Sequence, residues 1–189
     1  MSIIVLGSTN TTTCVSTSGC AVRARISFQM FKDLYAPALS GYGTSGFWQT
    51  VVLQASDMSE AIKHLVLAAS SLHWGPKPDS DEVQTTGGRN VPFLAHYGRA
   101  LQVLGRCASS DVFVVLVACV LLAVCDDLQQ NSCGAQRHIQ AGQRILIAQS
   151  RAFQLSHWKH TEALGEIAST LSRLCAPRPI SAMLHPLVY

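Results

Sequence analysis

An uninterrupted apolar run from residue 112 to residue 125 constrains the fold of this chain more than any other feature. The run contains fourteen apolar residues, with Asp111 before it and Asp126 and Asp127 after it. A helix needs about 20 apolar residues to cross the hydrocarbon core of a bilayer. The run is too short for that and instead predicts a core helix that is apolar on every side and covered by neighbouring helices.

The segments on either side of this run have the periodicity of amphipathic helices. Apolar residues recur every three to four positions, and no stretch alternates with period two for long enough to predict a strand. We therefore predict an all-α fold, a bundle of about six to seven mostly antiparallel helices around one apolar central helix. The expected helical segments lie near residues 28–35, 47–55, 57–73, 92–104, 111–125, 133–153 and 161–174.

Residues with special backbone chemistry predict where these helices begin and end. Pro37 is expected to stop the first helix, because proline cannot continue the hydrogen-bond pattern. Asp57 and Glu60 have the spacing of a capping box, and Ser109 or Ser110 is expected to cap the apolar helix. The expected buried faces are Ala61, Ile62, Leu65, Val66, Ala69 and Leu72 in one helix, Phe93, Leu94, Tyr97, Leu101 and Leu104 in the next, and Ile139, Gly142, Ile145 and Leu146 in the long helix after the apolar run.

The length of 189 residues suits one domain. Residues 1–25 are predicted to form a mobile tail because their first part is rich in Ser and Thr without periodicity. The helical domain is expected over residues 26–176, with a C-terminal tail over 177–189. Residues 75–90 mix glycine, proline and charged residues, which predicts an exposed loop open to proteolysis.

The composition excludes several classes of function. The formal charge is only +3, and the basic residues are scattered without a dense run, so the chain lacks the pattern of a nucleic-acid-binding protein. Hydrophobic residues make up 48% and charged residues 13%, which predicts that part of the surface contacts a partner. Seven cysteines are an odd number, which favours reduced thiols inside a cell over a secreted disulfide framework.

No motif predicts catalysis, a metal site or a cofactor. Residues 41–46 spell GxGxxG, but the strand that should precede a phosphate-binding turn is missing, so a plain turn is favoured. His157 and His160 could share a helical face, yet no second pair of ligands is spaced to join them. There is no G-x-S-x-G nucleophile motif and no cysteine within an activating motif. We therefore expect a non-enzymatic protein without cofactors.

Arg137, Arg144 and Arg151 recur every seven residues in the long helix expected over 133–153. On an α-helix this spacing drifts by only about 20° per step, so the three arginines share one face. Such a face is either simply solvated or contacts an acidic partner. We treat these three residues as the candidate partner surface.

Four blocks of sequence resemble a known family. Residues 47–73 begin with the aromatic pair Phe47-Trp48 shortly after Leu-Ser-Gly, and continue into AIxHxxxAxxxLH with His64 and His73. Residues 96–104 contain Tyr97 in a Tyr-x-x-Ala pattern, residues 115–131 form an apolar helix that ends in acidic residues, and residues 138–146 contain His138 and Gly142. In this order the blocks resemble the fungal-specific transcription factor domain, the regulatory region of fungal zinc binuclear cluster transcription factors.

The resemblance implies a role in transcription regulation, in the nucleus, through contact with the transcription machinery or a partner transcription factor. Control of a secondary-metabolite pathway is one expectation, and a homo-oligomer is left open. The sequence contains no C-x2-C pair, whereas family members carry a six-cysteine zinc cluster, so no direct sequence-specific DNA contact is expected. It also stops earlier than the family's regulatory region. Membrane association is not expected, and without the nuclear role the protein would be cytoplasmic.

Two alternatives stay open. The chain could be a small helical ligand-binding protein or enzyme of a fungal biosynthetic pathway, with a pocket formed by His64, His73 and Tyr97. It could also be a truncated gene fragment without function that does not fold alone.

Overall fold

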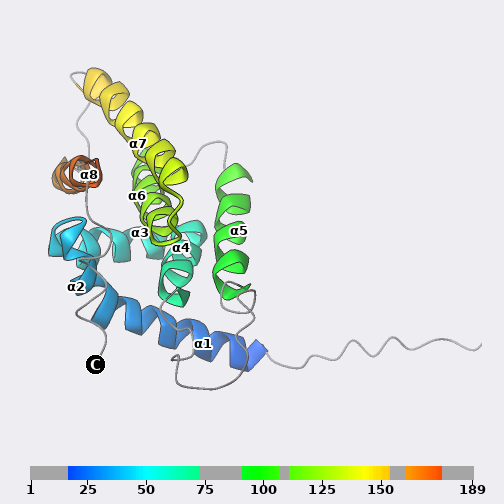
Figure 1. The fold of residues 1–189 in the computed structure, drawn as a ribbon. Helices are drawn as coiled ribbons and strands as arrows, with labels where there is room; N and C mark the ends of the chain where they lie inside the picture. Colours follow the sequence, from blue (N-terminus) through cyan, green and yellow to red (C-terminus); the bar gives the residue numbers. More distant parts are fainter. Residues whose placement is uncertain (1–16, 73–90, 107–110, 154–160, 176–189) are drawn as a thin grey trace, which may run out of the picture.

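The chain is all-α, as predicted (Figure 1). The computed structural model describes residues 17–72, 91–106, 111–153 and 161–175, and these ranges contain helices and turns but no strand. No helix within them is both long enough and apolar enough to cross a membrane. The helices are α1 (Thr17–Met30), α2 (Ala36–Ala38), α3 (Val52–Met58), α4 (Glu60–Ser71), α5 (Val91–Arg106), α6 (Val112–Leu128), α7 (Ser132–Phe153) and α8 (Thr161–Leu174).

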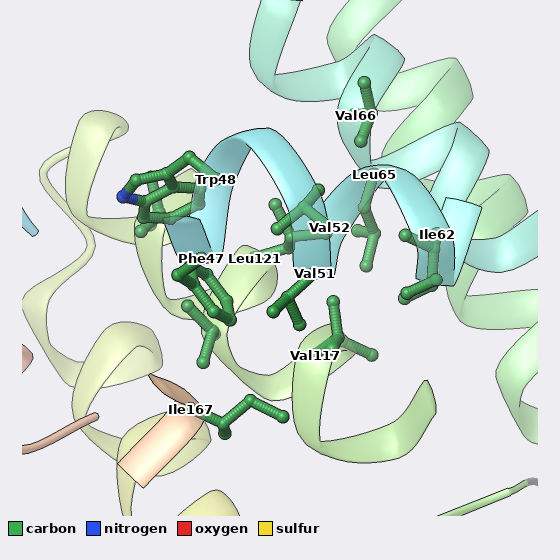
Figure 2. Packing of buried hydrophobic residues seen from close by; sticks show 14 of the residues in the cluster. Phe47, Trp48, Val51, Val52, Ile62, Leu65, Val66, Val117, Leu121 and Ile167 are labelled. Atoms are coloured by element: carbon green, nitrogen blue, oxygen red, sulfur yellow. The ribbon is translucent and has the colours of Figure 1, made fainter. Parts of the chain in front are cut away.

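The apolar run forms α6, and nearly all of it is buried. Every side chain from Phe113 to Asp126 except Val115 is buried. The helix contacts α3, α4, α7 and α8. In Figure 2, Val117 and Leu121 of α6 lie among apolar side chains from the segment around residues 47–52 and from α4 and α8. Because α1 and α5 pack mainly on α4, a bundle with α6 as its one centre stays a prediction.

Asp111 caps α6, which corrects the expectation that Ser109 or Ser110 does so. Its side-chain Oδ1 accepts a hydrogen bond from the backbone N–H of Phe113 at 3.0 Å. A carboxylate at this position satisfies an N–H that has no partner within the helix and also complements the positive end of the helix dipole. Both serines lie outside the described residues.

The N-terminal helix begins at Thr17, inside the segment 1–25 that the sequence predicts as a tail. Residues 21–25 consist of Ala, Val and Arg, and alanine and arginine favour helix. The apolar residues of α1 are not gathered on one face, so periodicity gives no signal there. Residues 1–16 and the predicted tail 177–189 lie outside the described ranges.

Pro37 does not stop the first helical segment, contrary to the prediction. A π-helical turn, η1 (Phe31–Tyr35), follows α1, and the Ala36 N–H donates to the carbonyl of Phe31. Pro37 then lies in the first turn of α2, a position at which proline is tolerated. The chain continues through a 3-10 turn, η2 (Leu39–Gly41), to a second π-helical turn, η3 (Phe47–Val51).

The capping box predicted at Asp57 is also not observed. Asp57 lies inside α3, and the extended backbone of Ser59 separates α3 from α4. Ser59 is therefore the N-cap residue of α4, without a side-chain capping hydrogen bond. The buried stripe of α4 includes Ala61, Ile62, Leu65, Val66 and Ala69, as expected, whereas Leu72 is only partly buried.

The structure confirms part of the predicted buried face of α5, at Phe93, Tyr97 and Leu104, and corrects the rest. Phe93 and Ala100 are buried, but Leu94 and Leu101 are 61% and 42% exposed. Tyr97 and Leu104 are partly buried against the core. Leu94 and Leu101 each follow one residue after Phe93 and Ala100 and form a second apolar stripe beside theirs. Helix α5 packs on α4, and only the stripe of Phe93 and Ala100 is covered.

Helices α6 and α7 form an antiparallel hairpin. Its turn is fixed by backbone hydrogen bonds from Gln129 and Asn131 to the carbonyl of Asp126, and Gln130 has a positive φ of 60°. The Asn131 side chain accepts from the Gly134 N–H at the start of α7. The inward positions of α7 follow the prediction, since Ile139 and Gly142 are buried and Ile145 and Leu146 are partly buried against the core.

Candidate functional site

A buried carboxylate, Asp126, joins three helices at the C-terminal end of α6. Its side chain accepts a hydrogen bond from the Tyr97 hydroxyl of α5 at 3.2 Å. Its other oxygen lies 3.4 Å from Nε2 of His138 on α7. Gly134 packs so closely that a Cβ there would overlap the Asp126 carboxylate. The arrangement gives a carboxylate that is only 7% exposed two polar partners from neighbouring helices, as burial of a charge requires.

The surroundings hold both partners of Asp126 in uncharged forms. Burial raises the pKa of the Tyr97 hydroxyl, and the negative charge of Asp126 and the hydrogen bond to it raise it further. Burial lowers the pKa of His138, and this effect is larger than the opposing attraction of Asp126. Both shifts favour the uncharged form of the partner. The cluster links α5, α6 and α7 through the Asp126 carboxylate.

The neighbouring carboxylate, Asp127, makes a second hydrogen bond to a distant segment. The Tyr42 hydroxyl donates to it at 2.8 Å, across 85 residues of sequence. The two acidic residues that end the apolar run thus hold two segments that precede it in the chain. The acidic pair was visible in the sequence, but its two tyrosine partners could not be identified from spacing alone.

The GxGxxG segment serves helix packing. Its first glycine belongs to the 3-10 turn η2 and follows helical residues, so the strand required before a phosphate-binding turn is absent from the described residues 17–46. A Cβ on Gly43 would lie 2.6 Å from Oγ1 of Thr170 and 3.2 Å from Nε1 of Trp48. The glycine therefore lets α8 approach this segment. The Thr44 hydroxyl also donates to Glu166 of α8.

The aromatic pair is structural. Phe47 and Trp48 are fully buried, and their rings meet edge to face with centroids 4.8 Å apart. Figure 2 shows both side chains within the core, with Ile167 of α8 on the same side as Phe47. The indole N–H of Trp48 has no hydrogen-bond partner among the residues that the structure describes.

Two histidines meet between α4 and α5. The Nδ1 atoms of His64 and His96 are 3.0 Å apart, and the ring centroids are 5.3 Å apart. Oε1 of Glu60 lies 3.6 Å from Nε2 of His64 and 3.6 Å from a guanidinium nitrogen of Arg99. Burial lowers the pKa of His96, and the adjacent His64 lowers it further. Sequence reasoning singled out His64 but not His96, because no local spacing connects residues on different helices.

The arginine face lies on α7. Arg137 and Arg144 are exposed, and Arg137 donates to the sulfur of Cys133 at 3.3 Å. The side chain of Arg151 and the whole of His73 lie outside the described residues. The proposed pocket of His64, His73 and Tyr97 is thus described for two residues, and these make polar contacts with His96 and Asp126.

The two cysteines of α6, Cys119 and Cys125, are buried thiols. Burial raises the pKa of Cys119 to about 11, and burial followed by the charge of Asp126 raises that of Cys125 to about 12. Such thiols stay protonated and are poor nucleophiles near neutral pH. Among the described residues, no three His, Cys, Asp or Glu side chains are grouped closely enough to hold a metal ion.

Comparison with known proteins adds no relative. No protein-family model matches the chain, and neither the curated proteins nor the solved structures give a match.

Proposed function

We propose that this chain is a helical interaction module of a fungal transcription regulator, which acts through contacts with other proteins and not by catalysis. The observation that carries the proposal is the ordered set of four blocks, residues 47–73, 96–104, 115–131 and 138–146, that resembles the fungal-specific transcription factor domain. The first block covers η3, α3 and α4, and the second lies in α5. The third covers most of α6 and the turn after it, and the fourth lies in α7.

The positions that carry the resemblance support this proposal because most of them maintain the fold. Phe47 and Trp48 are buried, and Tyr97 and His138 both contact Asp126. A Cβ on Gly142 would lie 2.9 Å from Leu171 of α8. We infer that the domain recognises its partners with its exterior, because these interior positions serve packing and contacts between helices.

The exterior offers two features suited to a protein partner. Exposed apolar side chains on α5 and α7 include Val91, Leu94, Leu101 and Ile147, and exposed Arg137 and Arg144 add positive charge on α7. Arginine and large apolar side chains are typical of interface centres. The proposed partner is the transcription machinery or another transcription factor, in the nucleus, with a secondary-metabolite pathway as the proposed target.

A tethering assay in a fungal cell tests this function. The full chain is fused to a heterologous DNA-binding domain, and transcription of a reporter with the matching site is measured. We expect the reporter level to change several-fold relative to the DNA-binding domain alone. The triple variant R137E/R144E/R151E should abolish most of this change.

A charge-matched control separates a specific surface from a general charge effect. The variant R25E/K32E/K63E alters the same number of charges at exposed positions on other segments, and it should keep the reporter response. Circular dichroism melts establish that all three proteins fold. No response to the wild-type fusion, or equal loss in both triple variants, would refute the proposal.

A further inference from the structure

One face of α5 carries apolar side chains that the described part of the chain leaves open. Val91, Leu94 and Leu101 are 60%, 61% and 42% exposed. Together with Gly98 and Gly105 they recur every three to four residues, which places all five on one face of the helix. Helix α5 lies at one edge of the molecule and packs on α4 (Figure 1). We call these five residues the outer stripe.

The glycines of the outer stripe are not explained by packing within the chain. A Cβ added to Gly98 or Gly105 would meet no atom of the described residues within 4 Å. At Gly142 of α7, by contrast, a Cβ would lie 2.9 Å from Leu171. Gly98 lies in the middle of α5, where glycine is less favourable than alanine. A close neighbour from another molecule would give this glycine a structural role.

The order of large and small residues along the outer stripe fits a second copy of α5 that runs in the antiparallel direction. If a two-fold axis passes between residues 99 and 100, Leu94 lies opposite Gly105 of the second copy, and Gly98 lies opposite Leu101. By symmetry each of these pairs occurs twice. A leucine then faces a glycine at every level of the contact, so the side chains of each helix fill the space that the other leaves.

The charges beside the outer stripe also favour the antiparallel pair. Helix α5 contains no acidic residue, and its arginines are Arg99 and Arg106. In the antiparallel pair the two copies of Arg106 stand about 20 Å apart along the axis, beyond the Debye length of about 8 Å. Arg99 lies near the two-fold axis, but its charge is offset by Oε1 of Glu60 in the same chain, 3.6 Å away. A parallel pair would place each arginine beside its own copy.

The area of this contact suits a weak dimer. The 16 residues of α5 span about 24 Å, and a contact about 10 Å wide over this length buries roughly 500 Å² on both copies together. Stable complexes bury about 1,200–2,000 Å². We propose that the outer stripe is a self-association surface, through which two copies of this chain form a weak antiparallel α5–α5 dimer. The dimer does not depend on a role in transcription.

Sedimentation velocity of the full chain from about 5 to about 500 µM tests the dimer. We expect a monomer at the low end and a reversible dimer at the high end. The variant L94Q/L101Q removes both leucines of the contact and should raise the dissociation constant by at least about tenfold. The matched control V22Q/I26Q removes two side chains of α1 that are 51% and 44% exposed, and it should leave the dissociation constant unchanged.

A compensating pair of substitutions distinguishes this register from general hydrophobic association. Gly98→Leu places a leucine against Leu101 of the second copy, and Leu101→Ala leaves a gap beside Gly98, so each should weaken the dimer several-fold. The variant G98L/L101A restores one large and one small residue in each pair and should return the dissociation constant to within about threefold of the wild-type value. Circular dichroism melts establish that every variant folds.

Four outcomes would overturn the proposal. They are a monomer throughout the concentration range, a tighter dimer in G98L, no recovery in G98L/L101A, and an equal loss in V22Q/I26Q and L94Q/L101Q.

Discussion

Two helical glycines, Gly142 and Gly98, have opposite surroundings and should respond oppositely to alanine. A Cβ on Gly142 would lie 2.9 Å from Cδ1 of Leu171 and 3.3 Å from Cβ of Cys119, and Leu171 is fully buried. Because that side chain has no free space, we expect Gly142→Ala to lower the free energy of unfolding by about 1–3 kcal/mol. Around Gly98 there is nothing within 4 Å, so Gly98→Ala should raise it by about 0.5–1 kcal/mol.

Urea denaturation of the two variants measures both changes. Equal stabilisation by the two alanines would show that α7 and α8 are not packed as closely as described.

The hydrogen bond between Tyr97 and Asp126 should appear as a coupling energy. In a double-mutant cycle with Tyr97→Phe and Asp126→Ala, we expect the two losses of stability to overlap by about 1 kcal/mol, because either change removes the same bond. Asp127 bonds to Tyr42 and not to Tyr97. The cycle of Tyr97→Phe with Asp127→Ala should therefore be additive within about 0.5 kcal/mol. Comparable coupling in both cycles would contradict the assignment.

At the scale of the element, the Asp111 side chain is expected to stabilise the first turn of α6. Asp111→Ala removes the acceptor for the Phe113 N–H and should cost about 1 kcal/mol of stability. Asp111→Asn keeps an acceptor oxygen and should cost only a fraction of this amount. Thermal or chemical denaturation distinguishes the two variants, and an equal loss in both would assign the effect to charge alone.

The helices that the sequence predicted well are those whose signal is local. The apolar run and the stripe of α4 identify themselves by pattern, and so does the long α7. The start of α1 was missed because its apolar residues do not share one face. Passage of the chain through Pro37 was missed because it depends on a preceding π-helical turn, which no spacing rule anticipates. Leu94 was placed wrongly because only α4, a distant segment, decides which stripe of α5 is covered.

For the whole molecule, stability should fall as the pH decreases from 7.5 to 5.5. The folded-state pKa values of His96 and His138 are lowered, mainly by burial, whereas unfolded histidine titrates near about 6.5. Below this pH the unfolded chain therefore binds more protons than the folded one, and the free energy of unfolding declines until the folded-state pKa values are passed. This contribution is fully present above about pH 6.5.

Urea denaturation at several pH values measures the slope, and H96Q/H138Q should flatten it. If the free energy of unfolding of the wild-type protein stays level or rises as the pH is lowered from 7.5 to 5.5, the lowered pKa values of His96 and His138 are contradicted.

The polar contacts show what a sequence leaves undetermined at this scale. His64, Tyr97 and His138 were singled out through the resemblance, but the sequence did not identify their partners. His96 was not singled out at all, and Asp126 was noted only as an acidic end of the apolar run. Each of these contacts joins residues on different helices. Local patterns specify helices and their apolar faces, whereas pairing across helices depends on how those faces are packed together.

Two contacts join the first part of the chain to α6: the hydrogen bond from Tyr42 to Asp127, and the apolar cluster that Val52 shares with Val117 and Leu121 (Figure 2). These contacts have a consequence for biosynthesis. The ribosome releases the first half of the core before it has made the helix that covers it. Until α6 emerges, the nascent chain displays apolar side chains that chaperones bind and that promote aggregation. A premature stop codon before Asp127 would thus yield an insoluble product and not a smaller domain.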